Sequence, residues 1–199
     1  MDLIRPNRPE DLDALHEICL KTCDRGADAT HLYQDPRIIG EIFAAPYATL
    51  EPHHAFVAED EIGVGGYILG TADTRAFEAR CEAEWWPDLR ARYHDAADTP
   101  PGQRSREQWD AHYIPHPPPN PQAVIDVAPA HLHIDLLPRL QGLGVGKRLM
   151  DTWLAAIGGR AHLGCQAGNH RAQRFYEIYG WRRLEGVGPK SEVWMAFGA

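Results

Sequence analysis

The sequence predicts a mixed α/β (α+β) fold in which a sheet of six to seven strands is flanked by helices and carries a helical insertion. Short runs of period-two alternation recur along the chain between segments of helical periodicity. A glycine-rich stretch at 141–147 joins one such run to a helix, and a segment at about 74–122, rich in tryptophan and proline, interrupts this order. At 199 residues the chain is large enough for one domain, so residues 1–199 are expected to form a single domain with that insertion.

The first third of the chain predicts three strands and two helices. In order, they are a strand at Leu3-Ile4-Arg5, a helix opened by Pro9 with Leu12, Leu15, Ile18 and Cys19 on its apolar face, a helix after Asp35-Pro36 ending near Pro46, and strands at His54 to Glu59 and Ile62 to Thr71. Glycine inside a strand marks a bulge or a close backbone approach, so Gly63, Gly65 and Gly66 predict one in the third strand.

The insertion is expected to be mostly helical. The pattern predicts a helix up to Trp86 that breaks at Pro87 and resumes, then a shorter helix from Ser105 to His112 and a stiff proline run at 115–121. Two interpretations stay open: a helical hairpin whose aromatic residues form its own core, or a wall of the substrate cleft. Trp85 and Trp86 are adjacent and cannot face the same way on a helix, which makes them candidates for substrate binding.

The last third predicts the elements that carry chemistry. A strand at 131–137 places His131, His133 and Asp135 on one face, and Leu132, Ile134 and Leu136 on the other. A helix follows from Val145, with Leu149, Thr152, Trp153 and Ala156 at helical spacing, and Gly158-Gly159 ends it. The remaining elements are a strand at Ala161 to Gln166, a helix from Asn169 to Tyr179, and a last strand at Lys190 to Phe197.

The glycine loop is typical of a phosphate site. Glycines let the backbone approach a ligand closely, and a helix start offers unpaired N–H groups and the positive end of a dipole. A Walker loop is excluded because Gln141 stands at its first glycine position and Arg148 follows Lys147. The dinucleotide fingerprint also fails, since its third glycine is missing. What remains is Gln-x-x-Gly-x-Gly, with Gln141, Gly144 and Gly146 as fixed points; a glycine-rich helix cap without a ligand is the open alternative.

This loop, together with Asn169 to Tyr176 and Tyr179-Gly180-Trp181, resembles the GCN5-related N-acetyltransferase (GNAT) superfamily. Two further segments, Glu17 to Asp28 and Gly65 to Asp73, are similar to the acetyltransferase-like C-terminal domain of O-GlcNAcase. The resemblance implies a stand-alone bacterial homologue of that domain with a GNAT fold. The three glycines at 142, 144 and 146 are those that the eukaryotic relatives are generally regarded as having lost, so the resemblance implies an intact cofactor site here.

The resemblance implies an acetyl-CoA site. Its expected members are Leu136, Leu137, Gln141, Gly142, Leu143, Gly144, Val145, Gly146, Lys147, Arg148, Asn169, Ala172, Phe175 and Tyr176. It further implies that Leu136 and Leu137 pair with the pantetheine arm through their backbones, and that Tyr176 protonates the departing thiolate. For Phe175 packing in the core is the preferred interpretation, and core packing is also the alternative for Tyr176.

Acetyl transfer to an amine requires a base, because a lysine-like amine with a pKa of about 10.4 is protonated at neutral pH. The polar face at 131–135 supplies the candidates Asp135, His133 and His131, in that order, with a satisfied structural hydrogen bond as the alternative for each. The sequence therefore predicts an acetyl-CoA-dependent N-acetyltransferase acting on an unspecified small-molecule or peptide amine. An acetyl-CoA-binding pseudoenzyme or interaction module is the alternative, and a scaffold that binds no CoA is a weaker one. The acidic run at Glu78, Glu82 and Glu84 hints at a cationic amine, although a charge run is usually a solvated face.

Composition excludes other classes. A net charge of −8 argues against nucleic-acid binding, and no apolar run reaches membrane-spanning length. The N-terminus lacks the charge and apolar core of a signal peptide, so a cytoplasmic location with reduced cysteines is expected. His131-x-His133 and His112-x-x-x-His116 have metal-ligand spacing, but no nearby cysteine or carboxylate completes either, so no metal is expected. Oligomeric state is not encoded in any of these patterns.

Overall fold

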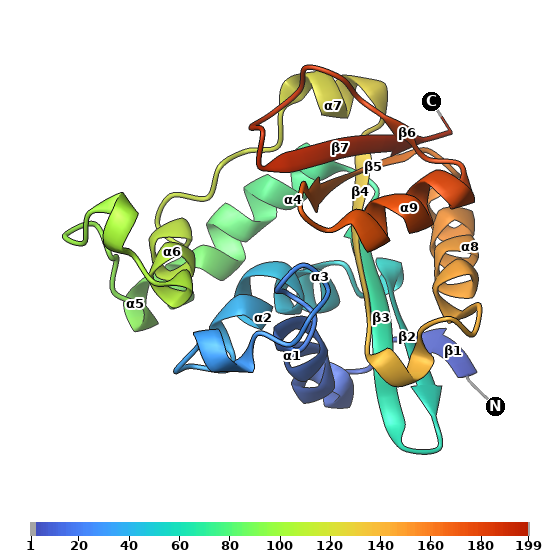
Figure 1. Cartoon of the computed structure of the whole chain (residues 1–199), viewed down its shortest axis with the longest axis horizontal. Coiled ribbons are helices and arrows are strands. Elements are labelled where there is room, and N and C mark those ends of the chain that lie inside the picture. Colours follow the sequence, from blue (N-terminus) through green and yellow to red (C-terminus); the bar gives the residue numbers. More distant parts are fainter. Residues whose placement is uncertain (1–2, 199) are drawn as a thin grey trace.

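The computed structural model describes residues 3–198 and shows a seven-stranded mixed sheet in the order β1-β2-β3-β4-β5-β7-β6 (Figure 1). Met1 and Ala199, the ends of the predicted domain, lie outside the described residues. The strands are β1 (Leu3–Pro6), β2 (Ala55–Asp60), β3 (Gly63–Thr71), β4 (Ala130–Leu136), β5 (Ala161–Gln166), β6 (Arg182–Arg183) and β7 (Glu192–Phe197). All pairs are antiparallel except β4 with β5. The predicted fold class is confirmed.

Helices cover both faces of this sheet. On one side lie α1 (Leu12–Leu20), α2 (Ile38–Phe43), α3 (Ala45–Leu50), α4 (Thr74–Arg80), α5 (Trp86–Arg92) and α6 (Arg106–Tyr113). On the other side lies α8 (Val145–Ile157), while α7 (Gln122–Val127) and α9 (His170–Tyr179) flank the C-terminal strands (Figure 1). None of the helices formed by residues 3–198 is long and apolar enough to cross a membrane.

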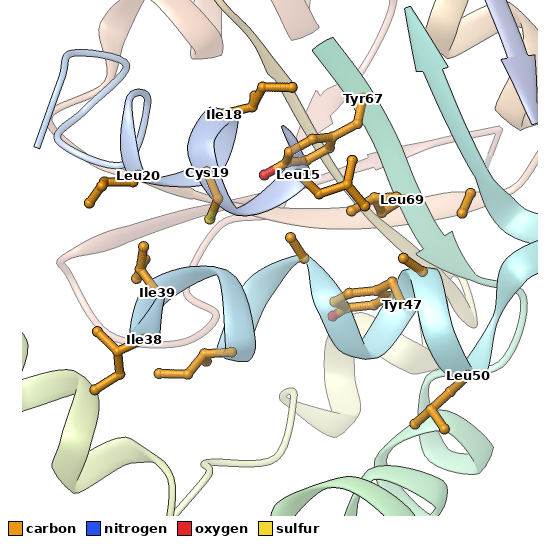
Figure 2. Close-up of a cluster of buried hydrophobic side chains, with 14 of the residues drawn as sticks. Leu15, Ile18, Cys19, Leu20, Ile38, Ile39, Tyr47, Leu50, Tyr67 and Leu69 are labelled. Carbon is orange, nitrogen blue, oxygen red and sulfur yellow. The ribbon is translucent and has the colours of Figure 1, made fainter. Parts of the chain in front are cut away.

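Two apolar clusters hold these layers together. The first joins α1, α2 and α3 to β3 through residues such as Leu15, Ile39 and Tyr67 (Figure 2). The second joins α8 to the opposite face of the sheet, where Trp153 is fully buried beside Ile68. Their separation follows from strand alternation, because neighbouring residues of β3 point to opposite faces.

The strand pairing that matters most for function is that between β4 and β5. Parallel pairing is confined to Ala130 with Ala161 and His131 with His162. Both strands continue for several residues beyond these pairs, so they diverge and leave a wedge between 132–136 and 164–166. The two strands are therefore splayed at this end of the sheet.

The predicted bulge lies at Gly65. Ala58 pairs with Gly66 and Glu59 with Val64, which leaves Gly65 as the extra residue of β3. A Cβ at Gly65 would lie 2.5 Å from Arg139 Nη2. The bulge thus lets the Arg139 side chain cross the strand and bond Asp60 at 2.9 Å.

Three helical predictions need correction. The helix expected to end near Pro46 ends at Phe43, and Pro46 instead lies in the first turn of a separate helix, α3, where a missing N–H costs nothing. The helix expected to break at Pro87 passes through a π-helical turn at Cys81–Trp85 and restarts as α5. The sequence analysis did not predict α7, whose six residues are too short for a periodic signal.

The buried face of α8 also differs from the predicted one. Thr152 is half-buried and Ala156 exposed, whereas Met150 and Leu154 lie in the core. The buried stripe of α8 is therefore rotated from the one expected.

Close packing at Gly70 of β3 generates a stability prediction. A Cβ there would lie 2.3 Å from the His131 carbonyl oxygen and 2.4 Å from Trp153 Cζ2, neither of which can move freely. We expect Gly70→Ala to lower the free energy of unfolding by about 2–3 kcal/mol through overpacking. Gly102→Ala, where a Cβ meets nothing within 4 Å, is the control and should change it by less than about 0.5 kcal/mol. Urea unfolding measures both, and equal midpoints would contradict the packing argument.

Candidate functional site

A cavity of about 1180 Å³ occupies the wedge between β4 and β5. One wall is formed by 132–136 of β4 and the other by 164–166 of β5. The glycine loop and α9 close one end, while the α1–α2 connection and α6 close the other. Because the sheet is open between β4 and β5, the cavity extends from the α8 face of the sheet to the α1 face. A continuously paired sheet would separate these two faces.

The glycine loop exposes its backbone to this cavity. Gly142 and Gly144 have φ values of 76° and 77°, which glycine adopts without strain, and a Cβ at either would meet nothing within 4 Å. Gly144 caps α8, so the first N–H groups of that helix have no intrahelical acceptor and point toward the cavity end. Gly146 has a different role, since a Cβ there would press on Leu136 Cδ1 at 3.2 Å and Phe175 Cζ at 3.3 Å.

The other predicted loop residues occupy varied positions. Gln141 donates from Nε2 to the Leu136 carbonyl at 2.6 Å and so ties the loop to the end of β4. Val145 is buried in the core, and Leu143 is 62% exposed. Lys147 lines the cavity and pairs with Asp151 at 2.7 Å, whereas Arg148 is exposed on α8. For Leu143 and Val145, the backbone rather than the side chain is therefore the part suited to contact a phosphate.

The backbone groups that face the wedge are not all those predicted. Leu137 donates its N–H to Gly65 of β3 at 2.8 Å and accepts from Leu140 at 2.9 Å, so both of its groups are engaged. Because N–H and C=O directions alternate along a strand, Ile134 and Leu136 are the residues whose groups point toward β5. The pairing of Leu136 and Leu137 with a pantetheine arm therefore stays a prediction; of these two residues, it is Leu136 whose backbone is directed toward the wedge.

On the opposite wall, α9 places its predicted residues along the cavity. Asn169 caps the helix by accepting the Ala172 N–H at 3.1 Å. Phe175 is half-buried against Gly146, and Tyr176 is 8% exposed. Burial raises the pKa of Tyr176, and the Cys165 and Asp135 charges raise it further, so its hydroxyl stays protonated at neutral pH.

The polar face of β4 divides into a part held by structural hydrogen bonds and a part that lines the cavity. His131 is 5% exposed and lies 2.7 Å from Tyr47 Oη through Nε2 and 2.7 Å from Thr74 Oγ1 through Nδ1. The Thr74 hydroxyl donates to the Pro129 carbonyl, which can only accept, so it accepts from His131 Nδ1–H. Burial holds the pKa of His131 well below its ordinary value. His131 is therefore a neutral ring held by structural hydrogen bonds.

His133 and Asp135 both line the cavity. Burial lowers the pKa of His133 to about 4, so its ring is neutral at pH 7. Burial also raises the pKa of Asp135 above its usual range, against the lowering effect of hydrogen bonds from Tyr67 and Thr22. The Tyr67 hydroxyl donates to Asp135 Oδ2 at 2.7 Å. Of the three candidate bases, Asp135 combines access to the wedge with a pKa moved toward neutrality.

Two residues that bear on the cavity were not predicted. Tyr67 does not line it but bonds Asp135, and it was detectable as the antiparallel neighbour of Asp135 once the two strands were aligned in register. Asp110 of α6 is another, and it accepts from the Tyr33 hydroxyl at 2.6 Å. Its position depends on how the insertion folds back over α2, and no local sequence signal reports that contact.

A smaller cavity of about 440 Å³ adjoins the first and shares His133, Phe43 and Tyr113 with it. Its walls are aromatic residues of α3, α4 and α5 and the proline run at 117–121. Trp86 lines it and is 6% exposed. Trp85 instead donates Nε1–H to the Glu41 carbonyl at 2.9 Å and packs on the first apolar cluster.

The acidic run near these tryptophans is neutralised by arginines. Glu78 pairs with Arg75, Glu82 with Arg90 and Glu84 with Arg80. The hint of a cationic acceptor drawn from these three residues is therefore not supported, and the alternative of a solvated, paired face holds.

Comparisons with known proteins agree with this geometry. The profile of the Acetyltransferase (GNAT) family matches residues 19–181. The solved structure of SsHAT is 37% identical, covers 98% of this chain and 96% of its own, and superposes with a TM-score of 0.87. A phosphinothricin acetyltransferase from Sinorhizobium meliloti, solved in complex with AcCoA, is 14% identical over 98% of this chain and 86% of its own, with a TM-score of 0.54, and supports the fold alone.

Among curated proteins, the O-GlcNAcase of Rattus norvegicus is 34% identical over 90 residues. The aligned part is 45% of this chain and 10% of that protein, so the chain matches about a tenth of the curated relative's length.

The raised pKa of Asp135 generates a prediction about stability. A carboxyl whose folded-state pKa exceeds its unfolded value of about 3.9 favours folding when protonated, and this contribution is lost as pH rises through the folded-state pKa. We therefore expect Asp135→Asn, which stays neutral, to raise the midpoint of thermal unfolding at pH 7–8 by up to about 4 °C. The gain should vanish at acidic pH, where Asp135 is also neutral.

Thermal unfolding followed by circular dichroism between pH 4 and 8 measures this effect. Asp98→Asn, at an exposed position, is the control and should leave the midpoint unchanged. A lower midpoint for Asp135→Asn at pH 8 than at pH 5, relative to the wild-type chain, would contradict the assigned cause.

Proposed function

Because this chain belongs to the GNAT acetyltransferase family, we propose that it transfers the acetyl group of acetyl-CoA to an amine within the wedge between β4 and β5. The observation that carries the proposal is the early end of β4–β5 pairing, which opens a cavity leading directly to the glycine loop. A diphosphate fits the helix start of α8, and an extended amide arm fits the unpaired edge of β4.

The acid–base chemistry is assigned to Asp135. An amine enters as an ammonium, loses a proton to the Asp135 carboxylate, and attacks the thioester carbonyl carbon with its lone pair. The tetrahedral intermediate then collapses with cleavage of the C–S bond. A base with a raised pKa suits this step, since it accepts a proton at neutral pH more readily than an ordinary carboxylate, and Tyr67 orients it through the 2.7 Å hydrogen bond.

Protonation of the leaving thiolate is assigned to Tyr176. Its hydroxyl lines the same cavity from α9 and stays protonated, so it is a donor rather than an anion at neutral pH. A free thiol has a pKa of about 8.5, so protonation of the thiolate demands less assistance than deprotonation of the amine. Holding both substrates in the wedge supplies the larger share of the rate.

The acceptor is assigned to the smaller cavity. It meets the larger one at His133, and its walls include Tyr47, Phe77 and Trp86. Such walls favour an amine with an apolar body, while the nearby carboxylates Glu78 and Glu82 are already paired with arginines.

The alternative is an acetyl-CoA-binding module without catalysis. Both functions use the glycine loop, but only the enzyme requires Asp135 and Tyr176 to act on bound substrate. Binding and turnover must therefore be measured separately.

Binding is tested by calorimetry with acetyl-CoA. We expect the wild-type chain to bind, and Gly144→Glu to weaken binding by at least about 100-fold, because it strains a left-handed residue and places a negative charge at the phosphate end. Gly186→Glu is a matched control, since Gly186 also has a positive φ of 73° and open space around it, but lies outside the cavity lining. Absence of binding by the wild-type chain would exclude both functions.

Catalysis is tested by release of free CoA with a panel of primary amines. We expect Asp135→Asn to lower kcat/KM by about 10²–10⁴-fold while acetyl-CoA affinity is kept, and Tyr176→Phe to cause a smaller loss. Tyr179→Phe, on the same helix with its hydroxyl bonded to Asp151, is the control. Tight acetyl-CoA binding with no turnover for any amine would favour the non-catalytic module.

A further inference from the structure

Three potential metal ligands converge in the insertion, away from the acetyl-CoA cavity. Asp95 lies in the loop between α5 and α6, His112 in the last turn of α6, and His116 just beyond it. Their ligand atoms all lie within 4.8 Å of one another. The sequence analysis noted the spacing of His112 and His116 but no carboxylate beside them, because Asp95 comes from the preceding loop and joins them only through the fold.

The side chains of Asp95, His112 and His116 already contact one another in the structure. His112 Nδ1 lies 2.7 Å from Asp95 Oδ1, and His116 Nε2 lies 3.0 Å from Asp95 Oδ2. The two imidazole rings are 4.9 Å apart between centroids. His116 lies in the turn that follows α6, where its backbone N–H donates to the Tyr113 carbonyl at 3.0 Å, and this turn brings its ring beside that of His112.

We propose that Asp95, His112 and His116 bind a zinc ion, with water as the fourth ligand. Two imidazoles and a carboxylate form a ligand set that zinc prefers, and three protein ligands leave one position open. Tetrahedral zinc at bond lengths of about 2.0–2.2 Å requires the ligand atoms to lie roughly 3.3 Å apart. The ligand atoms now lie between 2.7 and 4.8 Å apart, which brackets that spacing, and the side chains are 28–59% exposed, so they have room to turn toward an ion.

The loop that supplies Asp95 has little buried surface to stabilise it, and a metal would add a cross-link. None of the residues at 93–105 is fully buried, and the segment reaches the first apolar cluster through the half-buried Tyr93 at its start. Its other fixed points are polar, such as the Arg104 Nε bond to the Thr99 carbonyl at 2.9 Å. A segment with so little buried surface is stabilised by a metal or a comparable cross-link.

The site also lies at one end of the proline run that lines the smaller cavity. The far end of that run is held by α4, where Glu78 accepts the Asn120 N–H at 2.8 Å and Arg75 bonds the Asn120 carbonyl at 2.9 Å. The near end begins at His116, whose side chain bonds Asp95 at 3.0 Å. Zinc would therefore fix the second end of the wall, and if the proposed function holds, its removal should raise KM for the amine without changing acetyl-CoA affinity.

Zinc binding is tested on the tag-free full chain after treatment with EDTA. Calorimetry with zinc chloride should give one ion per chain, and cobalt(II) should give the visible absorption of a tetrahedral complex. His112→Ala, His116→Ala and Asp95→Ala should each weaken zinc binding by at least about 100-fold, since loss of a second-shell partner alone costs 10–100-fold. His53→Ala, at an exposed histidine elsewhere, is the control and should bind as the wild type does.

Two readouts are independent of any enzymatic activity. Zinc should raise the thermal midpoint of the wild-type chain but not of the His112→Ala variant, and should slow tryptic cleavage within 93–105. A wild-type chain that shows neither saturable zinc heat nor a tetrahedral cobalt spectrum would overturn the proposal, and so would retained affinity in the His112→Ala/His116→Ala double variant. Both outcomes leave the acetyl-CoA assignment untouched, because that site is measured by acetyl-CoA binding.

Discussion

The end of β4–β5 pairing at His131 is the constraint on which the rest of the site depends. A sheet that stayed paired would separate the glycine loop on one face from the α1 face on the other. Divergence gives up several ladder hydrogen bonds, whose buried groups must find partners elsewhere or face a ligand. The Gln141 bond to Leu136 and the Leu137 bond to Gly65 hold the open edge of β4 in place. The wedge is thus a fixed feature of the fold.

Burial lowers the pKa of the two histidines on the polar face of β4 and raises the pKa of its aspartate. His131 lies where the strands are still paired, and two hydroxyls satisfy it. His133 and Asp135 lie where the strands have parted, so they face the cavity. Desolvation disfavours charge on both, which lowers the pKa of the imidazole and raises that of the carboxyl. The same strand therefore supplies a structural ring, a neutral ring and a carboxyl whose pKa is raised by burial.

The parts predicted correctly were those with a local signal. Alternation located β4, and the glycine spacing located the loop and the start of α8. The short helices α3 and α7 were missed because six residues give too little periodicity. The Tyr67–Asp135 bond depends on register between strands 68 residues apart in sequence, and the Asp95 cluster depends on a loop folding back on α6. Neither leaves a pattern in any one segment.

The sequence by itself determined the order of the main strands and the longer helices, the glycine loop, and the polar face of β4, because backbone preference and side-chain alternation act within a few residues. Only the tertiary structure decided which members of that face line the cavity and how their pKa values shift, since these depend on burial and on partners from β3, α3 and α4. It also decided which backbone groups the wedge exposes, how the arginines neutralise the acidic run, and that Asp95 meets two histidines. These are contacts between distant segments, and their free energies exist only once the chain has folded.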